Sequence, residues 1–308
     1  MSENKMKAVI CTAYGSPEVL TLKNIEKPVP GENEVLIKIV ATAVNSGDVR
    51  VRGLNVEGIF KIIMRFVLGF KRPRQPVLGL VLSGRVEEVG KNVKKLRPGD
   101  EVFASTGFKM GAYAQYITLP EKGNVMLKPL NASSEESAAI LFGGMSAIYF
   151  LEKAGIEPNR KVLIYGATGS VGAAAVEIAK HFKAHVTAVC GEQGVDLAKN
   201  LGSDAIMVYN SQDFRRTDEK FDIVFDAVGK TKKKECKELL KPGGKYVTVG
   251  AMDVAKETTA QMSLLKKLFE NGELHAWIDR TYSMEEIVEA HRYVDTGRKK
   301  ANVVVRIP

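Results

Sequence analysis

The stretch that decides the fold is Lys161-Val162-Leu163-Ile164-Tyr165-Gly166-Ala167-Thr168-Gly169-Ser170-Val171-Gly172. A buried-type strand runs into a glycine-rich turn, and small residues with helical character follow at 173–180. Glycines in this setting allow a tight turn and close approach of a pyrophosphate, and the helix N-terminus supplies amide donors. A tight turn without a ligand is the alternative. We predict a dinucleotide-binding loop made of Gly166, Ala167, Gly169, Ser170, Val171 and Gly172.

The residues around this loop predict a doubly wound α/β domain over residues 130–274. Ser133 and Glu136 have capping-box spacing, and a helical pattern follows as far as Ala154. Apolar runs separated by helical segments then indicate a parallel sheet that is covered on both faces. The expected strands are 161–165, 185–190, 205–209, 221–227 and 245–249.

The first third of the chain predicts antiparallel strands in a small β-barrel. Runs rich in Val and Ile alternate with Pro and Gly turns at 7–12, 34–44, 77–89, 101–104 and 111–119. In the tail, a helix capped by Ser283 and Glu286 precedes a strand at 302–307. We expect the tail to join the first domain, which then comprises 1–129 and 275–308. We interpret the amphipathic stretch 58–72 as a loop or helix that covers the core rather than a membrane or partner surface.

Composition narrows the class of protein. A chain of 308 residues favours two domains, and 45% hydrophobic with 26% charged residues excludes disorder. The net charge of +9 is compatible with an anionic partner or cofactor, or with solubility alone, and the scattered basic clusters lack aromatic residues, so nucleic acid is an unlikely partner. Three separated cysteines favour a reducing cytoplasm. We expect no signal peptide and no membrane span, since no apolar run approaches the ~20 residues required.

Elimination argues against metal and nucleophilic chemistry. Catalytic zinc needs three ligands among Cys, His and carboxylate, whereas all four histidines lie from His181 onward and the β region offers only Cys11. No Gly-x-Ser-x-Gly elbow follows a strand. Hydride transfer requires none of these groups, because a cofactor carries that chemistry.

Later strand ends extend the predicted cofactor site. Two of the predicted parallel strands are followed by Val228 and by Val249-Gly250. Open α/β sheets bind ligands at these strand ends, so we predict that the three residues contact the cofactor. An ordinary connecting loop without a ligand contact is the alternative. Cys190 stands about 20 residues after the loop, where NAD-binding enzymes place an acidic residue. A carboxylate there would oppose a 2′-phosphate by ~4 kcal/mol, so its absence favours NADPH. Glu192 lies close by and leaves NADH possible.

Motifs along nearly the whole chain carry a family resemblance. They are Tyr14-Gly15-Ser16-Pro17-Glu18-Val19-Leu20, Asn45-Ser46-Gly47-Asp48, Arg52-Gly53, Leu78-Gly79, Pro98-Gly99-Asp100-Glu101-Val102-Phe103, Gly111-Ala112-Tyr113-Ala114-Gln115-Tyr116 and Gly144-Met145-Ser146-Ala147. With the glycine loop, the sequence resembles the zinc-free quinone oxidoreductase branch of the medium-chain dehydrogenase/reductase superfamily. The resemblance implies a GroES-like β-barrel domain and a Rossmann domain.

The resemblance also implies roles for individual residues. Asn45 replaces the first cysteine ligand of zinc alcohol dehydrogenases, and Gly79-Leu80-Val81 replaces their Gly-His-Glu. In the family, the residue at Asn45 lies beside nicotinamide and substrate, Ser146 lies near the cofactor, and Tyr209 contacts the 2′-phosphate. Asn45 is therefore the predicted catalytic residue; capping a turn is its alternative role, and packing within a helix is that of Ser146.

The implied activity is zinc-independent hydride transfer from NADPH to a quinone or an α,β-unsaturated carbonyl compound. A zinc-free alcohol or aldehyde dehydrogenase and a crystallin-like structural or RNA-binding protein are the alternatives. After Val249-Gly250 the chain is too short for the final edge strand, which relatives commonly pair across a dimer. Both a monomer and a homodimer therefore stay open.

Overall fold

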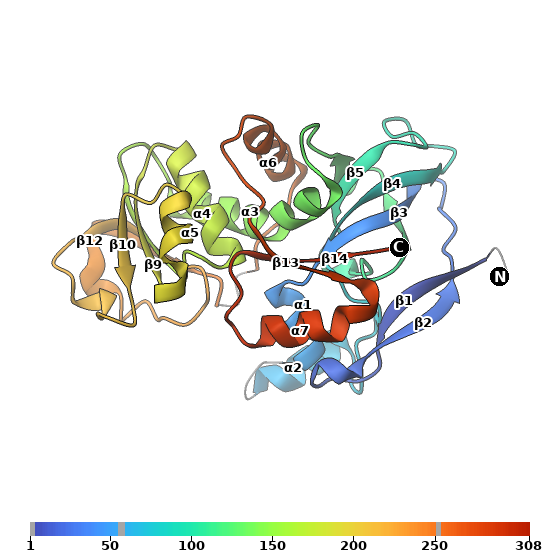
Figure 1. Ribbon diagram of the computed structural model, residues 1–308, viewed down its shortest axis with the longest axis horizontal. Helices are drawn as coiled ribbons and strands as arrows, with labels where there is room; N and C mark the ends of the chain where they lie inside the picture. Colours follow the sequence, from blue (N-terminus) through green and yellow to red (C-terminus); the bar gives the residue numbers. More distant parts are fainter. Residues whose placement is uncertain (1–3, 55–58, 251–253) are drawn as a thin grey trace. The chain divides into compact units, whose positions relative to one another are not determined.

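The computed structural model describes residues 4–54, 59–250 and 254–308, which form two compact units (Figure 1). One unit comprises Met1–Leu141 with Ile278–Pro308, and the other comprises Phe142–Trp277. The first boundary falls inside the long helix α3 (Ser134–Ala154), whereas the boundary expected from the sequence precedes this helix.

Antiparallel strands dominate the first unit. Strands β1 (Lys5–Cys11) and β2 (Leu20–Glu26) form a two-stranded sheet. A larger sheet has the order β13-β14-β3-β4-β5-β7, and β6 also pairs with β3. Its members are β3 (Glu34–Ala43), β4 (Val81–Val89), β5 (Glu101–Ser105), β6 (Tyr116–Pro120), β7 (Val125–Leu127), β13 (Ile278–Ser283) and β14 (Asn302–Arg306). Strand β14 pairs with β3, and the C-terminal segment Ile278–Pro308 belongs to the first unit.

Two glycines explain why the predicted strands are longer than the observed ones. The run expected over 77–89 becomes a strand only at Val81, because Gly79 has φ +99°. The run expected over 111–119 becomes one only at Tyr116, and Gly111 has φ +106°. Positive φ is left-handed backbone that cannot continue a strand. Strands β2, β7 and β13 were not predicted, since their burial patterns contain few buried positions.

Among the described residues, the helices that lie wholly in the first unit are α1 (Ser46–Gly53), α2 (Ile59–Leu68) and α7 (Ile287–Asp295). Single turns of 3-10 helix lie at η1 (Pro17–Val19), η2 (Gly107–Lys109) and η6 (Met284–Glu286). The predicted capping box is present, because Ser283 N donates to Glu286 Oε2 at 2.8 Å. Helix α7 packs beside α1, which brings the C-terminal segment next to residues 46–53 (Figure 1).

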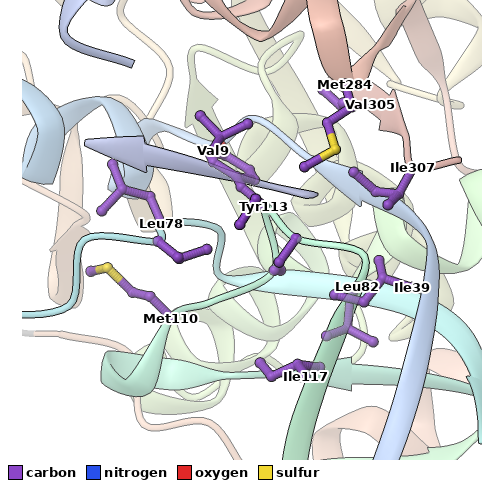
Figure 2. Packing of buried hydrophobic residues seen from close by; sticks show 14 of the residues in the cluster. Val9, Ile39, Leu78, Leu82, Met110, Tyr113, Ile117, Met284, Val305 and Ile307 are labelled. Atoms are coloured by element: carbon purple, nitrogen blue, oxygen red, sulfur yellow. The ribbon is translucent and has the colours of Figure 1, made fainter. Parts of the chain in front are cut away.

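The core of this unit draws side chains from both ends of the chain. Figure 2 shows Val9 and Tyr113 gathered with Met284 and Val305. All four are buried. Burying one such side chain contributes about 1.5–3 kcal/mol to the free energy of unfolding. The C-terminal tail therefore contributes directly to the stability of this unit.

The second unit is the predicted parallel sheet. Its order is β10-β9-β8-β11-β12, and every pair is parallel. The strands are β8 (Lys161–Tyr165), β9 (His185–Cys190), β10 (Ala205–Val208), β11 (Phe221–Asp226) and β12 (Leu240–Thr248). The chain runs outward from β8 through β9 to β10 and then returns to β11 on the other side. This reversal creates a topological switch point beside β8, where open α/β sheets bind ligands.

Helices and short turns lie between these strands, and one helix, α6, follows the last of them. They are α4 (Ser170–His181), η3 (Glu192–Gly194), α5 (Val195–Asn200), η4 (Phe214–Arg216), η5 (Lys237–Leu239) and α6 (Thr259–Glu270). Within the described ranges, β12 is the last strand of the sheet and the next element is α6. In those same ranges, no helix has both the length and the apolar character needed to cross a bilayer.

Candidate functional site

The glycine loop is held by backbone hydrogen bonds at the end of β8. The amides of Gly166 and Ala167 both donate to the carbonyl of Val189, at 2.9 and 3.1 Å. The amide of Gly169 donates to the carbonyl of Gly166 at 3.0 Å, and Gly169 is the N-cap of α4. Gly166 has φ +77°, which a residue with a side chain rarely adopts. The loop therefore ends where α4 presents its first amide groups.

Two further glycines allow close packing around the loop. A Cβ on Gly172 would lie 2.1 Å from the carbonyl oxygen of Gly166, so a side chain there is excluded. A Cβ on Gly143 in α3 would lie 2.4 Å from the carbonyl oxygen of Ser170. Ser146 is one helical turn beyond Gly143 and therefore shares its face of α3, toward the start of α4.

The ends of β11 and β12 meet the same loop. A Cβ on Gly166 would lie 2.2 Å from Val228 Cγ2, so Val228 covers that glycine. A Cβ on Gly229 would lie 2.5 Å from the Cα of Gly250, next to Val249. The structure thus brings together residues that lie far apart in the sequence.

Asp226 fixes this arrangement, and the sequence analysis did not single it out. Its buried carboxylate accepts hydrogen bonds from the amides of Val228 and Gly229 at 3.0 and 2.8 Å. It also accepts from the amide and hydroxyl of Thr231 at 2.7 and 2.9 Å. An aspartate at the end of a buried strand, followed by glycine, was the available signal.

The carboxyl ends of β9 and β10 complete this edge of the sheet, which is formed by the carboxyl ends of its strands. Cys190 is buried, and burial raises the pKa of its thiol. Tyr209 is half-exposed, and a Cβ on Gly191 would lie 2.7 Å from its hydroxyl oxygen. A Cβ on Gly194 would lie 2.8 Å from Thr168 Oγ1, so the β9–α5 connection rests on the glycine loop. The side chain of Glu192 is exposed.

This edge fits a dinucleotide. Gly166 and Gly172 leave no room for side chains, and the N-terminus of a twelve-residue helix supplies donors of the kind that bind a phosphate group. The predicted cofactor residues from β8, β9, β10, β11 and β12 lie at the carboxyl ends of adjacent parallel strands.

Asn45 lies in the other unit, between β3 and α1, and caps α1. Its amide N–H donates to Asp48 Oδ2 at 2.9 Å, and its side-chain Nδ2 donates to the carbonyl of Ala43 at 3.3 Å. Asn45 is buried, and the capping role considered from the sequence is present. A carboxamide nitrogen carries two hydrogens, and the Asn45 side chain also has a hydrogen bond to the Asp48 carboxyl group.

Asp48 joins Asn45 to the segment that contains Gly79. The buried Asp48 carboxylate accepts from Asn45 N and from Gly79 N, the latter at 3.1 Å. Burial raises its pKa to about 7, while the backbone donors and Tyr113 act in the opposite direction. A Cβ on Gly79 would lie 2.7 Å from Tyr113 Cδ1, so a larger residue would push the two segments apart.

The polar contacts continue from Tyr113 to α7. Arg52 Nη1 lies 3.2 Å from His291 Nδ1, and His291 Nε2 lies 3.2 Å from Tyr113 Oη. A guanidinium only donates, so Nδ1 accepts and the imidazole proton resides on Nε2, facing the tyrosine. Burial, and then Arg52, lower the pKa of His291 to about 3, so the ring is neutral. The Tyr113 hydroxyl is then available to donate to Asp48.

This buried chain was missed because its members come from separate segments. Arg52 is fixed further by Asp295, at 2.7 Å from Nη2, and by the carbonyl of Gly15, at 3.1 Å from Nε. No local spacing joins positions 48, 113 and 291, and only the fold brings them together.

The positions that hold zinc in related dehydrogenases carry Asn45, Leu80 and Val81. None of these side chains supplies a thiolate, imidazole or carboxylate ligand. Across the part of the chain that the structure describes, no three His, Cys, Asp or Glu residues are grouped closely enough to hold a metal ion.

Comparisons with known proteins match this architecture. The sequence model of one protein family, the alcohol dehydrogenase GroES-like domain, matches residues 31–129. The sequence model of a second family, the zinc-binding dehydrogenase, matches residues 170–283. A 2-methylene-furan-3-one reductase of Solanum lycopersicum is 35% identical over 321 residues, which span 98% of this chain and 79% of that protein. The chain belongs to the medium-chain dehydrogenase/reductase superfamily. An NADPH-dependent alkenal/one oxidoreductase of Arabidopsis thaliana is 30% identical, with 98% and 79% covered.

Solved structures of this superfamily support the same fold. The quinone oxidoreductase of Coxiella burnetii aligns with a TM-score of 0.84 at 23% identity, covering 99% of this chain and 100% of that one. The expected fold class and the resemblance identified from the sequence are confirmed. The chain is an oxidoreductase of the superfamily that uses a nicotinamide cofactor.

Proposed function

We propose that this chain uses NADPH to reduce a quinone or the double bond of an α,β-unsaturated carbonyl compound. The observation that supports the proposal is the glycine loop at Gly166 and Gly172, which has no room for side chains and precedes the N-terminus of α4, as a pyrophosphate-binding loop requires. The substrate class follows from relatives named as enone and alkenal reductases, which match 98% of the chain.

In this proposal, one part of the chain binds the cofactor and the other binds the acceptor. Residues 130–274 hold the cofactor through Ser146, the loop residues Gly166 to Gly172, and Cys190, Tyr209, Val228, Val249 and Gly250. Residues 1–129 with 275–308 hold the acceptor. When bound, the nicotinamide supplies a hydride for an electron-poor carbon.

Asn45 acts on the acceptor. An Nδ2 hydrogen of Asn45, exchanged from its contact with Asp48, donates to the carbonyl oxygen of the substrate, which polarises the conjugated system and orients it. Asp48 accepts a hydrogen bond from the backbone N–H of Asn45, and the carbonyl of Ala43 accepts one from its side chain. These two contacts fix the position of the carboxamide. The proton that completes the reduction comes from water or a cofactor hydroxyl.

A pair of Asn45 variants separates catalysis from helix capping. Aspartate is as good an N-cap as asparagine but lacks the amide donor, whereas alanine removes both functions. We expect Asn45→Asp to retain NADPH affinity while kcat falls about 100-fold, in the range of a lost oxyanion donor. Its thermal stability should fall as well, because the new carboxylate is buried beside the Ala43 carbonyl and Asp48. Full activity in Asn45→Asp would restrict this residue to capping.

The decisive assay is a cofactor-oxidation screen over quinones, enones and aldehydes. We expect turnover of quinones or enones with NADPH. If NADPH binds and no acceptor is turned over, the assignment fails. Turnover of aldehydes alone would favour the alcohol and aldehyde alternative.

The preference for NADPH rests on the end of β9, where Cys190 stands in place of a carboxylate and Glu192 is exposed. A carboxylate about 4 Å from the 2′-phosphate would oppose it by ~4 kcal/mol, and none occupies that position. We expect kcat/KM to favour NADPH at least about tenfold. The control pair is Glu192→Gln and Asp196→Asn, which remove one charge each in neighbouring turns. Wild-type preference for NADH, lost only in Glu192→Gln, would show that Glu192 binds the ribose.

Three further properties belong to this proposal. The partners are small molecules, and the chain acts as a monomer or homodimer. It works in the cytoplasm, and the free, buried thiols of Cys11, Cys190 and Cys236 suit a reducing compartment.

A further inference from the structure

Helix α2 and the turn after it present an apolar row to solvent, whereas the sequence analysis interpreted residues 58–72 as a cover for the core. Ile62, Phe66 and Phe70 are 58%, 59% and 52% exposed, and Val67 beside them is 59% exposed. Ile62 and Phe66 are one helical turn apart and share a face. The rings of Phe66 and Phe70 meet edge to face with centroids 4.8 Å apart. Contiguous exposed apolar surface of this kind marks an interaction site.

The row belongs to a fixed part of the unit. Tyr14 Oη donates to the carbonyl of Gly69 at 2.8 Å, and Arg65 Nη1 donates to the carbonyl of Phe70 at 2.6 Å. The amide of Arg74 donates to the carbonyl of Leu68 at 2.6 Å. Gly69, with φ +125°, is buried where a Cβ would lie 2.3 Å from the carbonyl oxygen of Arg72. These bonds tie the C-terminal end of α2 to the β1–β2 connection and set the direction of Phe70.

The charge around the row has a single sign. Residues 58–84 contain no Asp or Glu, and their basic residues are Lys61, Arg65, Lys71, Arg72 and Arg74. Lys71, Arg72 and Arg74 are exposed directly after the apolar row. An apolar row followed by three exposed cations complements a surface with anionic head groups above an apolar layer.

We propose that α2 with residues 69–74 seats this protein on an anionic lipid surface. Ile62, Phe66 and Phe70 enter the boundary between head groups and acyl chains, and the cations after Gly69 contact lipid phosphates and carboxylates. A second copy fits this surface less well, since a symmetric contact through α2 would bring the two cationic clusters together. The proposal is independent of the substrate.

Co-sedimentation of the full chain with vesicles tests it. We expect binding to phosphatidylcholine vesicles that contain phosphatidylserine, weaker binding to phosphatidylcholine alone, and loss of binding with added salt. Phe66→Ser with Phe70→Ser should weaken binding at least about tenfold, since two aromatic side chains no longer leave water. Lys71→Glu with Arg72→Glu and Arg74→Glu should weaken it by a similar factor or more.

Matched controls make the result specific. Lys232→Glu with Lys233→Glu and Lys234→Glu makes the same charge change at three exposed lysines of the other unit. Leu130→Ser removes an apolar side chain that is 90% exposed elsewhere. Both controls should bind as the wild type does, and thermal unfolding checks that every variant is folded.

Three outcomes would overturn the proposal. The first is absence of vesicle binding, and the second is equal binding by the α2 variants and their controls. The third is a concentration-dependent dimer, seen by sedimentation velocity and abolished by Phe66→Ser with Phe70→Ser, which would assign the row to a second copy.

Discussion

Asp48 and His291 are titratable groups buried in one polar chain, and burial shifts them in opposite senses. His291 has a folded pKa of about 3 against its ordinary 6.5. The unfolded chain therefore binds the extra proton, and the stability contributed by neutral His291 is complete above pH 6.5 and lost as pH falls. Asp48 has a folded pKa of about 7 against 3.8. Its contribution is complete below pH 3.8 and lost as pH rises toward 7.

These two slopes cancel between about pH 4 and pH 6.5, and single variants should expose them. In His291→Gln, the amide still accepts from Arg52 and donates to Tyr113, and Asp48 alone titrates. Its stability relative to wild type should fall by about 1.4 kcal/mol per unit as pH rises. In Asp48→Asn, it should fall by a similar amount as pH decreases. Urea unfolding across this window measures both.

The comparison between the two variants contains its own control. Surface groups contribute equally to both profiles and disappear in the difference. Profiles of both variants that run parallel to the wild type would contradict the assigned protonation states of Asp48 and His291.

The glycine loop gives a steric prediction. A Cβ on Gly172 would meet backbone at 2.1 Å, whereas one on Gly169 would meet it at 3.5 Å. Gly172→Ala should therefore destabilise the protein by about 1–3 kcal/mol and weaken NADPH binding at least about tenfold, since the loop must open. Gly169→Ala is the control: its Cβ meets no close atom, so only the loss of a glycine N-cap should lower the melting temperature, and by less than Gly172→Ala does. Calorimetry and NADPH fluorescence titration measure the two effects, and equal melting temperatures would refute the crowding argument.

At the scale of the element, the sequence predicted structure wherever signals are local. The strands around Gly166 and the helices that follow Ser133 and Ser283 lie as expected, because caps and apolar runs act within a few residues. Strand β13 was not predicted, because it forms by pairing with β14, which lies about 20 residues further along the sequence. The candidate cofactor site could be located from the sequence because the glycine loop at 166–172 is one continuous segment. The chain from Asp48 to His291 could not, since its residues meet only in the folded state.

Helix α4 is tied to the segment before β13 by one carboxylate. Glu177 is buried and accepts from His275 N at 3.1 Å, from His275 Nδ1 at 2.8 Å and from Trp277 Nε1 at 3.0 Å. Burial raises its pKa, and these donors oppose the rise. A side chain placed this way fixes where the chain leaves the second unit.

Glu177→Ala should therefore loosen that connection. Three donors would lose their acceptor, which costs about 1–3 kcal/mol for each one that stays buried and unsatisfied. Trp277 is the one tryptophan in the sequence, so its emission reports on the site directly. We expect a shifted emission maximum and a lower urea midpoint, with the exposed Glu152→Gln as control. An unchanged spectrum would show that Glu177 does not hold the indole.

At the scale of the whole molecule, three of the four histidines have side-chain contacts that occupy a ring nitrogen. His291 uses both ring nitrogens within its buried chain, and His181 and His275 each contact a glutamate. Cys11, Cys190 and Cys236 are buried and lie apart in the sequence. The carboxylate nearest to Asn45 in the sequence, Asp48, accepts from two backbone amides.

Catalysis should therefore be independent of zinc. A catalytic site would need three ligands where this chain offers Asn45, Leu80 and Val81, and an asparagine amide binds zinc far less well than a thiolate or imidazole. We expect metal analysis of the purified protein to find zinc well below one equivalent, and kcat/KM to stay unchanged after dialysis against a strong chelator. Carbonyl polarisation then falls to the Asn45 amide, so Asn45→Cys should lose activity that added zinc does not restore. One tightly bound zinc per chain, with activity lost on chelation and regained on reloading, would overturn this assignment of the acceptor site.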